Sequence, residues 1–475
     1  MTKVQLIPTK RFFVEMLTRD IELEDAILDL LDNCLDGVIR QGEKNDISKP
    51  YDGYWAEITF DKNHFKIKDN CGGIEKKLAT EYAFRMGRPE KYDDQDKNLP
   101  TVGVYGIGMK RSIFKMGNNA KVESYTKTDG TFKVVIDEPW MKNDTEWQLD
   151  LIELNSSNDL KGNQYGTMIY IDNLHEGISK QFDKTSNSTF EQLLKDIIST
   201  HYSYIIRKGF SVKLNGLDIQ PQITQIVYQE DFATLSNTDK VIAPYIYKSV
   251  KNDVEISVIV GFYRDLSTEK EENDALSGKP NASSKNAGWS IICNDRVVVF
   301  NDKSILTGWG EAGVPQYHTQ FISIAGIVNF KSNDPSKLPL KTTKRGVDAN
   351  SPLYMEIKAR MREGLKIFTD FTNKWKSKTQ RNIISSLDNK KITDTIDFLI
   401  ENPNIKFSKS RNHDNGEIYK PTLPKPSGIS SLKQITFHKE SSDIRMISEY
   451  FFEEERSPKD IGEKCFDEIL KKVKE

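Results

Sequence analysis

The chain has 475 residues, enough for about three domains of ordinary size, each with its own hydrophobic core. Hydrophobic residues make up 37% of it and charged residues 29%, and the net charge of −2 provides no overall basic field for nucleic acid. The four cysteines and six histidines are scattered, without a CxxC pair or an HExxH motif, which argues against a disulfide framework and a zinc site and favours the cytoplasm.

The first strong element is an amphipathic helix predicted over residues 22–40. Its apolar residues share one broad face, while Asp29, Asn33 and Asp36 follow one another on the opposite face. A helix that shows carboxylates to water is the simpler interpretation. However, Asp and Asn are poor helix formers, and a stripe of short acid and amide side chains suits a cation or a polarised water better than it suits helix stability.

A β-hairpin is predicted next, with alternating strands at 55–60 and 65–68 on either side of an Asp/Asn turn. Its second strand leads directly into Asp69, which is followed by Gly72 and Gly73. This order places a carboxylate at the floor of a pocket, with backbone that is free to approach a flat ligand. A plain Asn/Gly turn explains the same residues equally well.

Glycines are concentrated at residues 103–110, after a predicted helix at 76–86 and a polar loop at 88–101. They precede a helical stretch at 111–116, so their backbone N–H groups and the helix dipole are suited to hold phosphate, and Lys110 adds a positive charge. The spacing is not that of a Walker A motif, and no strand directly precedes it as a dinucleotide site requires.

Mostly antiparallel strands are predicted after this helix, at residues 120–125, 132–136, 147–154 and 166–171. Helices and a hairpin followed by such strands indicate an α+β sandwich and not a doubly wound sheet.

Taken together, these segments resemble the GHKL, or Bergerat-fold, ATPases, which include DNA gyrase, the large heat-shock chaperones, histidine kinases, MutL and the MORC proteins. The E-x-x-x-N-x-x-D box of that family is matched by residues 29–36 and its D-x-G-x-G box by residues 69–73. The glycine lid is matched by residues 103–110 and the strand that opens with Gly-Thr by residues 166–167. All four motifs occur in the family's order, which makes the resemblance far more specific than any one of them.

The resemblance implies ATP and Mg²⁺ as cofactors. Asn33 would coordinate Mg²⁺, Asp69 would accept a hydrogen bond from the adenine amino group, and Gly73 would let the base lie close. The glycine lid and Lys110 would surround the β- and γ-phosphates. The full cofactor-binding set implied in this way is Asn33, Asp36, Asp69, Gly73, Gly103, Gly106, Ile107, Gly108, Met109, Lys110 and Thr167.

Two positions depart from the family pattern. Cys71 replaces the first glycine of the second box, and Asp29 replaces the glutamate that activates water. Asp29 is the expected catalytic residue, but its side chain is one methylene shorter, and a base must come within hydrogen-bond reach of its water. We therefore expect slow hydrolysis, and we expect Asp29→Asn to abolish turnover while leaving nucleotide affinity intact.

The second half begins with a helix predicted at 190–206, and residues 266–288 have the composition of a flexible insertion. Strands are predicted at 210–216, 254–263, 289–300 and 321–330, and even this last, most apolar run is too short to cross a bilayer. A helix–strand module in this position resembles the transducer domain of gyrase, MutL and MORC proteins, in which a loop lysine reaches the γ-phosphate.

Lys344, in the basic loop 338–346, is the residue that best matches this transducer lysine, and it joins Asp29 as an expected catalytic residue. Arg345 is a near rival for the role. A basic loop that is simply solvated is the remaining alternative.

The predicted fold class is α+β, in three parts: a Bergerat-type α/β sandwich ATPase domain (1–185), a transducer-like α/β domain (186–350) and a mainly helical C-terminal region (351–475). The last part has a basic, aromatic-containing segment at 374–439, which suits either nucleic acid or a solvated linker. It ends in an amphipathic helix after Ser457 whose apolar face needs a partner.

We therefore expect a cytoplasmic ATP-binding clamp that hydrolyses ATP slowly, forms a homodimer through its ATPase domain and acts on DNA through the transducer-like or C-terminal region. Genome maintenance or defence against foreign DNA would suit it, with a separate effector protein as a further partner and no membrane. The alternative is a chaperone-like or signalling scaffold in which ATP gates protein binding. A histidine kinase is not expected, because residues 1–28 contain no histidine.

Overall fold

The structure is a computed structural model of the chain and describes residues 9–42, 48–85, 99–103, 106–155, 165–185, 189–233, 241–277, 282–376, 384, 389–410, 415–426, 438–452, 454 and 456–474. Most of the predicted loop 88–101, two residues of the glycine lid (Val104 and Tyr105) and parts of the basic segment 374–439 therefore lie outside the described residues. Residues 1–425 form one compact unit and residues 426–475 form a second.

The first sheet of the larger unit has eight strands in the order β5-β4-β3-β6-β2-β1-β7-β8. Neighbouring strands are antiparallel except for β1 and β7, which are parallel. The predicted hairpin is confirmed as β1 and β2, and β5 is shorter than the predicted strand 147–154. The bounds are β1 Trp55–Asp61, β2 His64–Asp69, β3 Gly117–Thr126, β4 Gly130–Ile136, β5 Leu151–Leu154, β6 Gly166–Leu174, β7 Ser211–Leu214 and β8 Leu217–Asp218.

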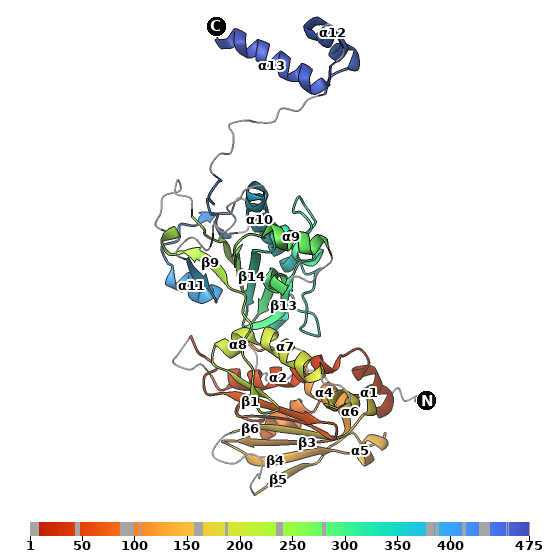
Figure 1. Cartoon of the computed structure of the whole chain (residues 1–475). Coiled ribbons are helices and arrows are strands. Elements are labelled where there is room, and N and C mark those ends of the chain that lie inside the picture. The colour runs from red at the N-terminus through yellow and green to blue at the C-terminus, as the bar shows by residue number, and fades with distance from the viewer. Residues whose placement is uncertain are drawn as a thin grey trace, which may run out of the picture. The chain divides into compact units, whose positions relative to one another are not determined.

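Helices α2 (Leu23–Arg40), α4 (Gly108–Met116), α6 (Glu176–Phe182) and α7 (Thr189–His201) form a layer on one face of this sheet (Figure 1). Their apolar residues and the inward face of the sheet make one buried core, which explains the broad apolar face of α2. Helices α1 (Lys10–Thr18), α5 (Glu138–Lys142) and α8 (Ser203–Arg207) lie next to this layer. The predicted helix 190–206 is interrupted at Tyr202 and forms α7 and α8.

The predicted helix 76–86 is confirmed over residues 76–83, although most of it is not α-helical. It begins as the short helix α3 (Lys76–Leu78) and continues as the π-helix η1 (Ala79–Ala83). Ala83 is the last residue of η1, where a carbonyl oxygen has no partner within the helix, and the side chain of Lys110 donates a hydrogen bond to it at 2.8 Å. π-Helical turns are frequent at functional sites, and this one lies beside the cavity described below.

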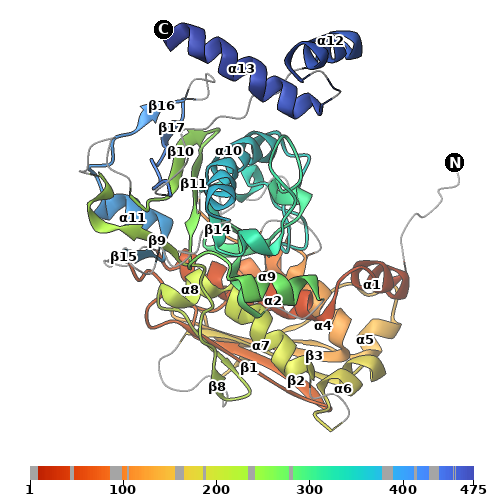
Figure 2. The same ribbon diagram turned by 45° about the horizontal axis from the view of Figure 1, so that its top comes forward.

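The second sheet has seven strands in the order β13-β12-β14-β11-β10-β17-β16, and helix α10 (Pro352–Trp375) packs against it (Figure 2). A separate pair, β9 and β15, lies beside helix α11 (Thr395–Glu401). The strand bounds are β9 Ile226–Gln229, β10 Tyr245–Lys251, β11 Val254–Phe262, β12 Gly288–Cys293, β13 Arg296–Asp302, β14 Ile324–Lys331, β15 Asn389–Ile392, β16 Ser408–Lys409 and β17 Glu417–Tyr419.

Part of the predicted flexible insertion 266–288 is instead the helix α9 (Glu269–Leu276). Its N-terminus carries a capping box, in which the Thr268 side chain accepts from the Glu271 N–H and Glu271 accepts from the Thr268 N–H. The S/T-x-x-E spacing that signals such a helix start is present in the sequence. Short 3₁₀ turns occur at η2 Glu230–Ala233, η3 Ala282–Asn286, η4 Ile305–Thr307, η5 Thr319–Phe321 and η6 Pro335–Lys337.

The smaller unit contains α12 (Ser441–Phe452) and α13 (Pro458–Lys474), the second of which confirms the helix predicted after Ser457. No described helix has both the length and the apolar character needed to cross a bilayer. The described residues are thus mixed α/β, as predicted, with two large sheets, a separate two-stranded pair, a helical layer and a helical end. The three-part division at residues 185 and 350 stays a prediction, since both sheets pack within one compact unit.

Candidate active site

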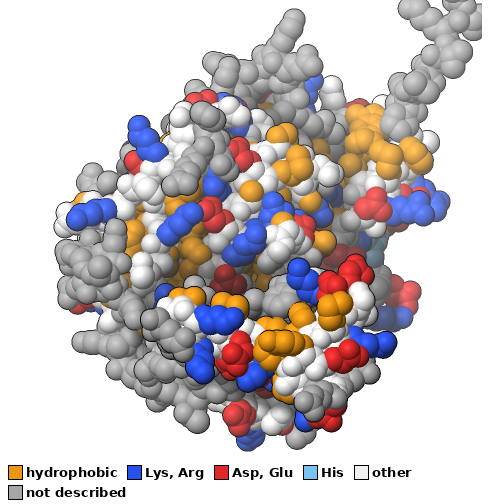
Figure 3. Space-filling view, turned by 90° about the horizontal axis from the view of Figure 1, so that it is seen from above, with side chains coloured by type: hydrophobic (Ala, Val, Ile, Leu, Met, Phe, Trp, Pro, Cys, Tyr) orange, Lys and Arg blue, Asp and Glu red, His pale blue; other side chains and the backbone are white. Residues whose placement is uncertain are grey.

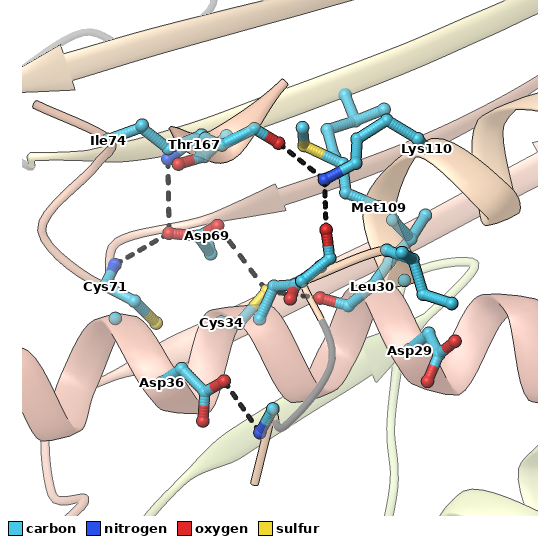
Figure 4. A pocket seen from close by; sticks show the side chains of 18 of the residues that line it. Asp29, Leu30, Cys34, Asp36, Asp69, Cys71, Ile74, Met109, Lys110 and Thr167 are labelled. Atoms are coloured by element: carbon cyan, nitrogen blue, oxygen red, sulfur yellow. Dashed lines mark hydrogen bonds between the residues drawn. The ribbon is translucent and has the colours of Figure 1, made fainter. Parts of the chain in front are cut away.

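A cavity of about 220 Å³ lies between α2, the ends of β2 and β6, and the start of α4. Figure 4 shows Asp29 and Asp36 on α2, Asp69 and Thr167 above them in that view, and Lys110 entering from α4. Every residue of the expected site lines this one cavity: Asp29, Asn33, Asp36, Asp69, Gly73, Gly103, Gly106, Ile107, Gly108, Met109, Lys110, Thr167 and Lys344.

Asp69 is a buried acceptor at one end of the cavity. Its Oδ1 accepts hydrogen bonds from the backbone N–H of Cys71 at 2.8 Å and of Thr167 at 3.2 Å. Its Oδ2 accepts from the Cys34 thiol at 3.5 Å. Burial raises the pKa of Asp69 to about 6, although these hydrogen bonds oppose the rise. The strand end and the Gly-Thr strand thus hold one carboxylate in a fixed orientation.

Position 73 requires a glycine because of its backbone conformation and because a neighbouring strand lies close to it. Its φ is +76°, and a Cβ placed there would lie 2.5 Å from the carbonyl oxygen of Tyr125 on β3. The close approach of β3 therefore explains this glycine without any ligand. That explanation stands beside the expected one, in which the glycine makes room for a flat base.

Asp36 holds the base of the glycine lid. Its two carboxylate oxygens accept hydrogen bonds from the backbone N–H groups of Val102 at 2.7 Å and Gly103 at 2.9 Å. A Cβ on Gly103 would lie 2.4 Å from Asp36 Oδ2, so only glycine permits this approach. Burial raises the pKa of Asp36, against the influence of Arg40 and Lys344. Because both oxygens are used by the lid, Asp36 is an anchor for the lid in this structure.

Asn33 is the exposed residue in an otherwise buried stretch of α2, and it lines the cavity. Within the part of the chain that the structure describes, no hydrogen bond is recorded for its side chain, so its amide oxygen is available to a ligand. No group of three His, Cys, Asp or Glu side chains suited to a metal occurs among the described residues. A magnesium ion here would thus take one protein oxygen and depend on phosphate and water for the rest, which fits its coordination habits.

Lys110 is almost fully buried at the start of α4. Its Nζ donates to the carbonyl oxygens of Ala83, at 2.8 Å, and of Gly106. Burial lowers the pKa of Lys110 to about 8. A buried ammonium that is held only by neutral carbonyl groups gains from an anion in the cavity.

Asp29 and Lys344 line the cavity, and they belong to an ion-pair network between α2 and residues far along the chain. Lys344 Nζ lies 2.9 Å from Asp32 Oδ2 and 3.5 Å from Asp29 Oδ1. Arg296 Nε lies 3.0 Å from Asp32 Oδ1, and the Tyr202 hydroxyl also donates to Asp32. Burial alone would raise the pKa of Asp32, but the neighbouring cations lower it below its ordinary value.

Lys344 is presented by a tight loop that the bridge between Leu340 and Val347 closes. Its backbone is in the left-handed region, with φ of +54°, which is unusual for a residue with a side chain and is often found at functional sites. Burial opposes its charge, yet Asp32 and Asp29 raise the pKa of Lys344 above its ordinary value. Its rival, Arg345, instead pairs with Asp25 at 2.9 Å.

Some charged residues of this ion-pair network were not among the residues expected to form the site: Asp25, Asp32, Arg111 and Arg296. Arg111 Nη2 lies 2.6 Å from Asp29 Oδ2. The two acids could have been found from the sequence. Positions 25, 29, 32 and 36 are spaced by four, three and four residues, which places their side chains on one helix face. Arg296 had no such signal, since its contact with Asp32 depends on how the second sheet packs, and the contact of Arg111 with Asp29 depends on how α4 packs against α2.

The β-turn between β12 and β13 connects the second sheet to the base of the lid. The Asn294 side chain donates to the carbonyl oxygens of Thr101 at 3.3 Å and Ser332 at 3.0 Å. Beside it, Asp295 accepts from the Tyr51 hydroxyl at 2.9 Å and pairs with Lys208 at 2.7 Å. The lid base therefore contacts α2 through Asp36 and the second sheet through Asn294.

Comparison with known families gives one match. Residues 21–167 match the family described as histidine kinase-, DNA gyrase B-, and HSP90-like ATPase. This stretch holds Asp29, Asn33, Asp69 and the glycine lid, but neither Lys344 nor any strand of the second sheet. No curated protein matches the chain. The family match supports the GHKL superfamily for residues 21–167, and with it the binding of ATP.

Proposed function

We propose that the chain is a magnesium-dependent ATPase of low turnover whose second sheet responds to the nucleotide. The observation that carries this proposal is the cavity itself. Its walls carry a buried acceptor, Asp69, the cations Lys110 and Lys344, and the side-chain amide of Asn33. This is the donor and charge pattern that a base, a triphosphate and one divalent cation require.

Each residue then has a defined role. Asp69 accepts a hydrogen bond from the adenine amino group, Asn33 holds Mg²⁺, and Lys110 and Lys344 neutralise phosphate charge. ATP bound with Mg²⁺ supplies the terminal phosphoryl group that water attacks, with cleavage of the bond between that phosphorus and the bridging oxygen. Asp29 orients the water and accepts its proton.

Slow turnover follows from the contacts of Asp29. Its Oδ2 is paired with Arg111 and its Oδ1 lies near Lys344. Both oxygens are thus engaged by cations that compete with an attacking water for the carboxylate, so turnover is slow until one ion pair opens. The shorter side chain of Asp, compared with the family's Glu, acts in the same direction.

We further propose that nucleotide binding changes the contacts of the second sheet and promotes dimerisation through the ATPase domain. The contacts of Lys344 with Asp32 and of Asn294 with Thr101 support this proposal, because they join the cavity and the lid base to that sheet. DNA is the proposed client, with a separate effector protein as a further partner. The homodimer and the DNA client rest on the resemblance to MutL and MORC proteins.

The second candidate function is a scaffold in which ATP gates the binding of a protein. The charge distribution favours it, since the face in Figure 3 intersperses Lys and Arg with Asp and Glu and shows no continuous basic surface. The net charge of −2 agrees with this observation. The exposed apolar residues Phe466, Ile469 and Val473 on α13 are also suited to a protein partner.

Two measurements test the proposal. Phosphate release from ATP with Mg²⁺ should be slow and should be abolished by Asp29→Asn, and a release rate that this variant leaves unchanged would exclude Asp29 as the base. DNA binding should then be measured with ATP, with ADP and with the β,γ-imido analogue of ATP across a salt series. Retention on DNA that depends on nucleotide supports the clamp, whereas no binding at low salt favours the scaffold.

A further inference from the structure

Arg111 lies on the wall of the cavity, in the first turn of α4 and directly after Lys110. Its Nη2 is 2.6 Å from Asp29 Oδ2, and the side chains of the two residues are 13% and 4% exposed. The pair is thus largely shielded from water, where a charge-assisted hydrogen bond is strong. Arg111 lies outside the four family motifs of the sequence, which gave it no role.

The guanidinium of Arg111 is incompletely satisfied in this position. Its Nε is buried and has no hydrogen-bond partner in the structure as described. A guanidinium carries five N–H donors in one plane and suits two oxygens of a phosphate at once. A buried, unsatisfied donor is uncommon and calls for a ligand or a rearrangement as its explanation.

The surroundings of Arg111 favour an anion. The N-terminus of α4 lies against Asp29, since a Cβ on Gly108 would be 3.3 Å from that carboxylate. The helix dipole adds positive character at the same place, and Lys344 Nζ lies 3.5 Å from Asp29 Oδ1. Asp29 is therefore the internal counterion of this group of positive charges, and a phosphate in the cavity would compete with it for Arg111.

We propose that Arg111 distinguishes a nucleoside triphosphate from a diphosphate: it pairs with Asp29 when no terminal phosphate is present and moves to the terminal phosphate when one is bound. The move releases Asp29 Oδ2 to orient water. After hydrolysis and loss of phosphate, Arg111 returns to Asp29 and holds it again. This inference rests on the proposed function, since it needs ATP to bind in this cavity.

The consequence is a coupling between occupancy and chemistry. The group that pairs with Asp29 is also the group that recognises the terminal phosphate, so the base becomes free only when that phosphate is in place. Arg111 contacts the terminal phosphate directly in this scheme, and it acts on the attacking water through Asp29. Its selectivity for the triphosphate is a property that a purely structural arginine would not have.

The test compares affinities for ADP and for the β,γ-imido analogue of ATP, both with Mg²⁺, by calorimetry on the full chain. Arg111→Ala should weaken the analogue about tenfold and ADP less than about twofold, since one charged contact to the terminal phosphate is lost. Arg111→Lys should lie between wild type and Arg111→Ala. Lys115→Ala, at the other end of α4, is the control and should change neither affinity.

A second variant tests the competition directly and keeps the test valid if Arg111→Ala does not fold. Asp29→Asn removes the counterion, so affinity for the analogue should rise severalfold, and the rise should shrink in the Asp29→Asn/Arg111→Ala double variant. This differs from the unchanged affinity that the sequence alone predicts for Asp29→Asn. The inference is contradicted if Arg111→Ala weakens ADP and the analogue equally or changes neither, or if Asp29→Asn leaves the analogue's affinity unchanged. Failure of wild type to bind either nucleotide would instead contradict the proposed function itself.

Discussion

The two ends of the cavity bury carboxylates in opposite ways. At the end that contains Asp69, the partners are backbone N–H groups and a thiol, all from within residues 21–167. At the other end, Asp32 is held by Arg296 and Lys344, which come from the second sheet and its following loop. The partners of Asp69 thus all lie within the matched domain, whereas those two partners of Asp32 lie outside it.

The pKa shifts record this difference. Burial raises the pKa of Asp69 to about 6, because neutral donors compensate only part of the lost hydration. Asp32 is as deeply buried, yet the charges of Lys344 and Arg296 lower its pKa. The difference teaches that the surroundings of Asp69 are set locally, whereas the charge around Asp32 depends on the docking of the second sheet; in the proposed function these are the base end and the phosphate end.

The largest expected effect concerns Arg296 and Lys344, the two cations that come from outside the matched domain. Arg296→Met leaves Asp32 buried with only one cation, and breaking a buried pair in this way costs about 3–5 kcal/mol. Unfolding by denaturant should show this loss in the free energy of unfolding. Lys337→Ala, which removes an exposed ion pair with Asp253, should have little effect. A similar small effect for both variants would mean that the second sheet does not stabilise α2.

Asp69→Asn should act on nucleotide affinity and lower it about 10- to 100-fold, the range expected for a hydrogen bond to a charged group. The amide would present an N–H group to the backbone donors of Cys71 and Thr167 or to the base. Calorimetric titration with ATP measures the effect, and Asp61→Asn in the exposed hairpin turn is the matched control. Unchanged affinity in Asp69→Asn would remove Asp69 from the base site.

Asp69 also predicts a pH dependence on the acid side. Its pKa is raised from 3.8 to about 6, so ionising it costs stability, and that cost is incurred as pH rises through this interval. The ionised form is the better acceptor for adenine, so affinity should fall about tenfold for each pH unit below about 6. Adenosine is the appropriate probe because it carries no titrating phosphate. A flat profile in wild type between pH 5 and about 7 would contradict this role.

Lys110 predicts a smaller effect on the alkaline side, at the phosphate end. Its pKa is lowered to about 8, so the charged form is lost as pH rises above that value. Affinity for ATP should decrease about fivefold between pH 7.5 and about 9.5, whereas affinity for adenosine should not change. Lys110→Arg should remove the dependence, because arginine stays charged throughout. An equal change for both ligands would indicate a general effect of pH.

The fold and the local half of the site could be predicted because they are encoded in short segments. The apolar face of residues 22–40, the hairpin that ends at Asp69 and the glycines before α4 each carry their signal within a few residues. All the residues expected from these segments line the cavity. The helix α9 shows a local signal that was overlooked, since Thr268 and Glu271 have the capping-box spacing.

The other half of the site could not be predicted from the sequence. Arg296 lies in a buried strand, and nothing in its neighbours indicates that its guanidinium contacts an acid 264 positions earlier in the chain. The role of Asp36 differs for a similar reason, because its hydrogen bonds go to the backbone of Val102 and Gly103. Such contacts follow from tertiary packing, which local patterns do not contain.

In the proposed ATPase, the second sheet completes the phosphate end of the cavity and leaves the base end unaffected. The most direct test is to titrate wild type and Lys344→Met with ATP plus Mg²⁺ and with adenosine. ATP should bind about tenfold more weakly to the variant while adenosine changes less than about twofold, since one buried positive charge is lost. Equal loss for both ligands, or no loss for ATP, would contradict this role of the second sheet.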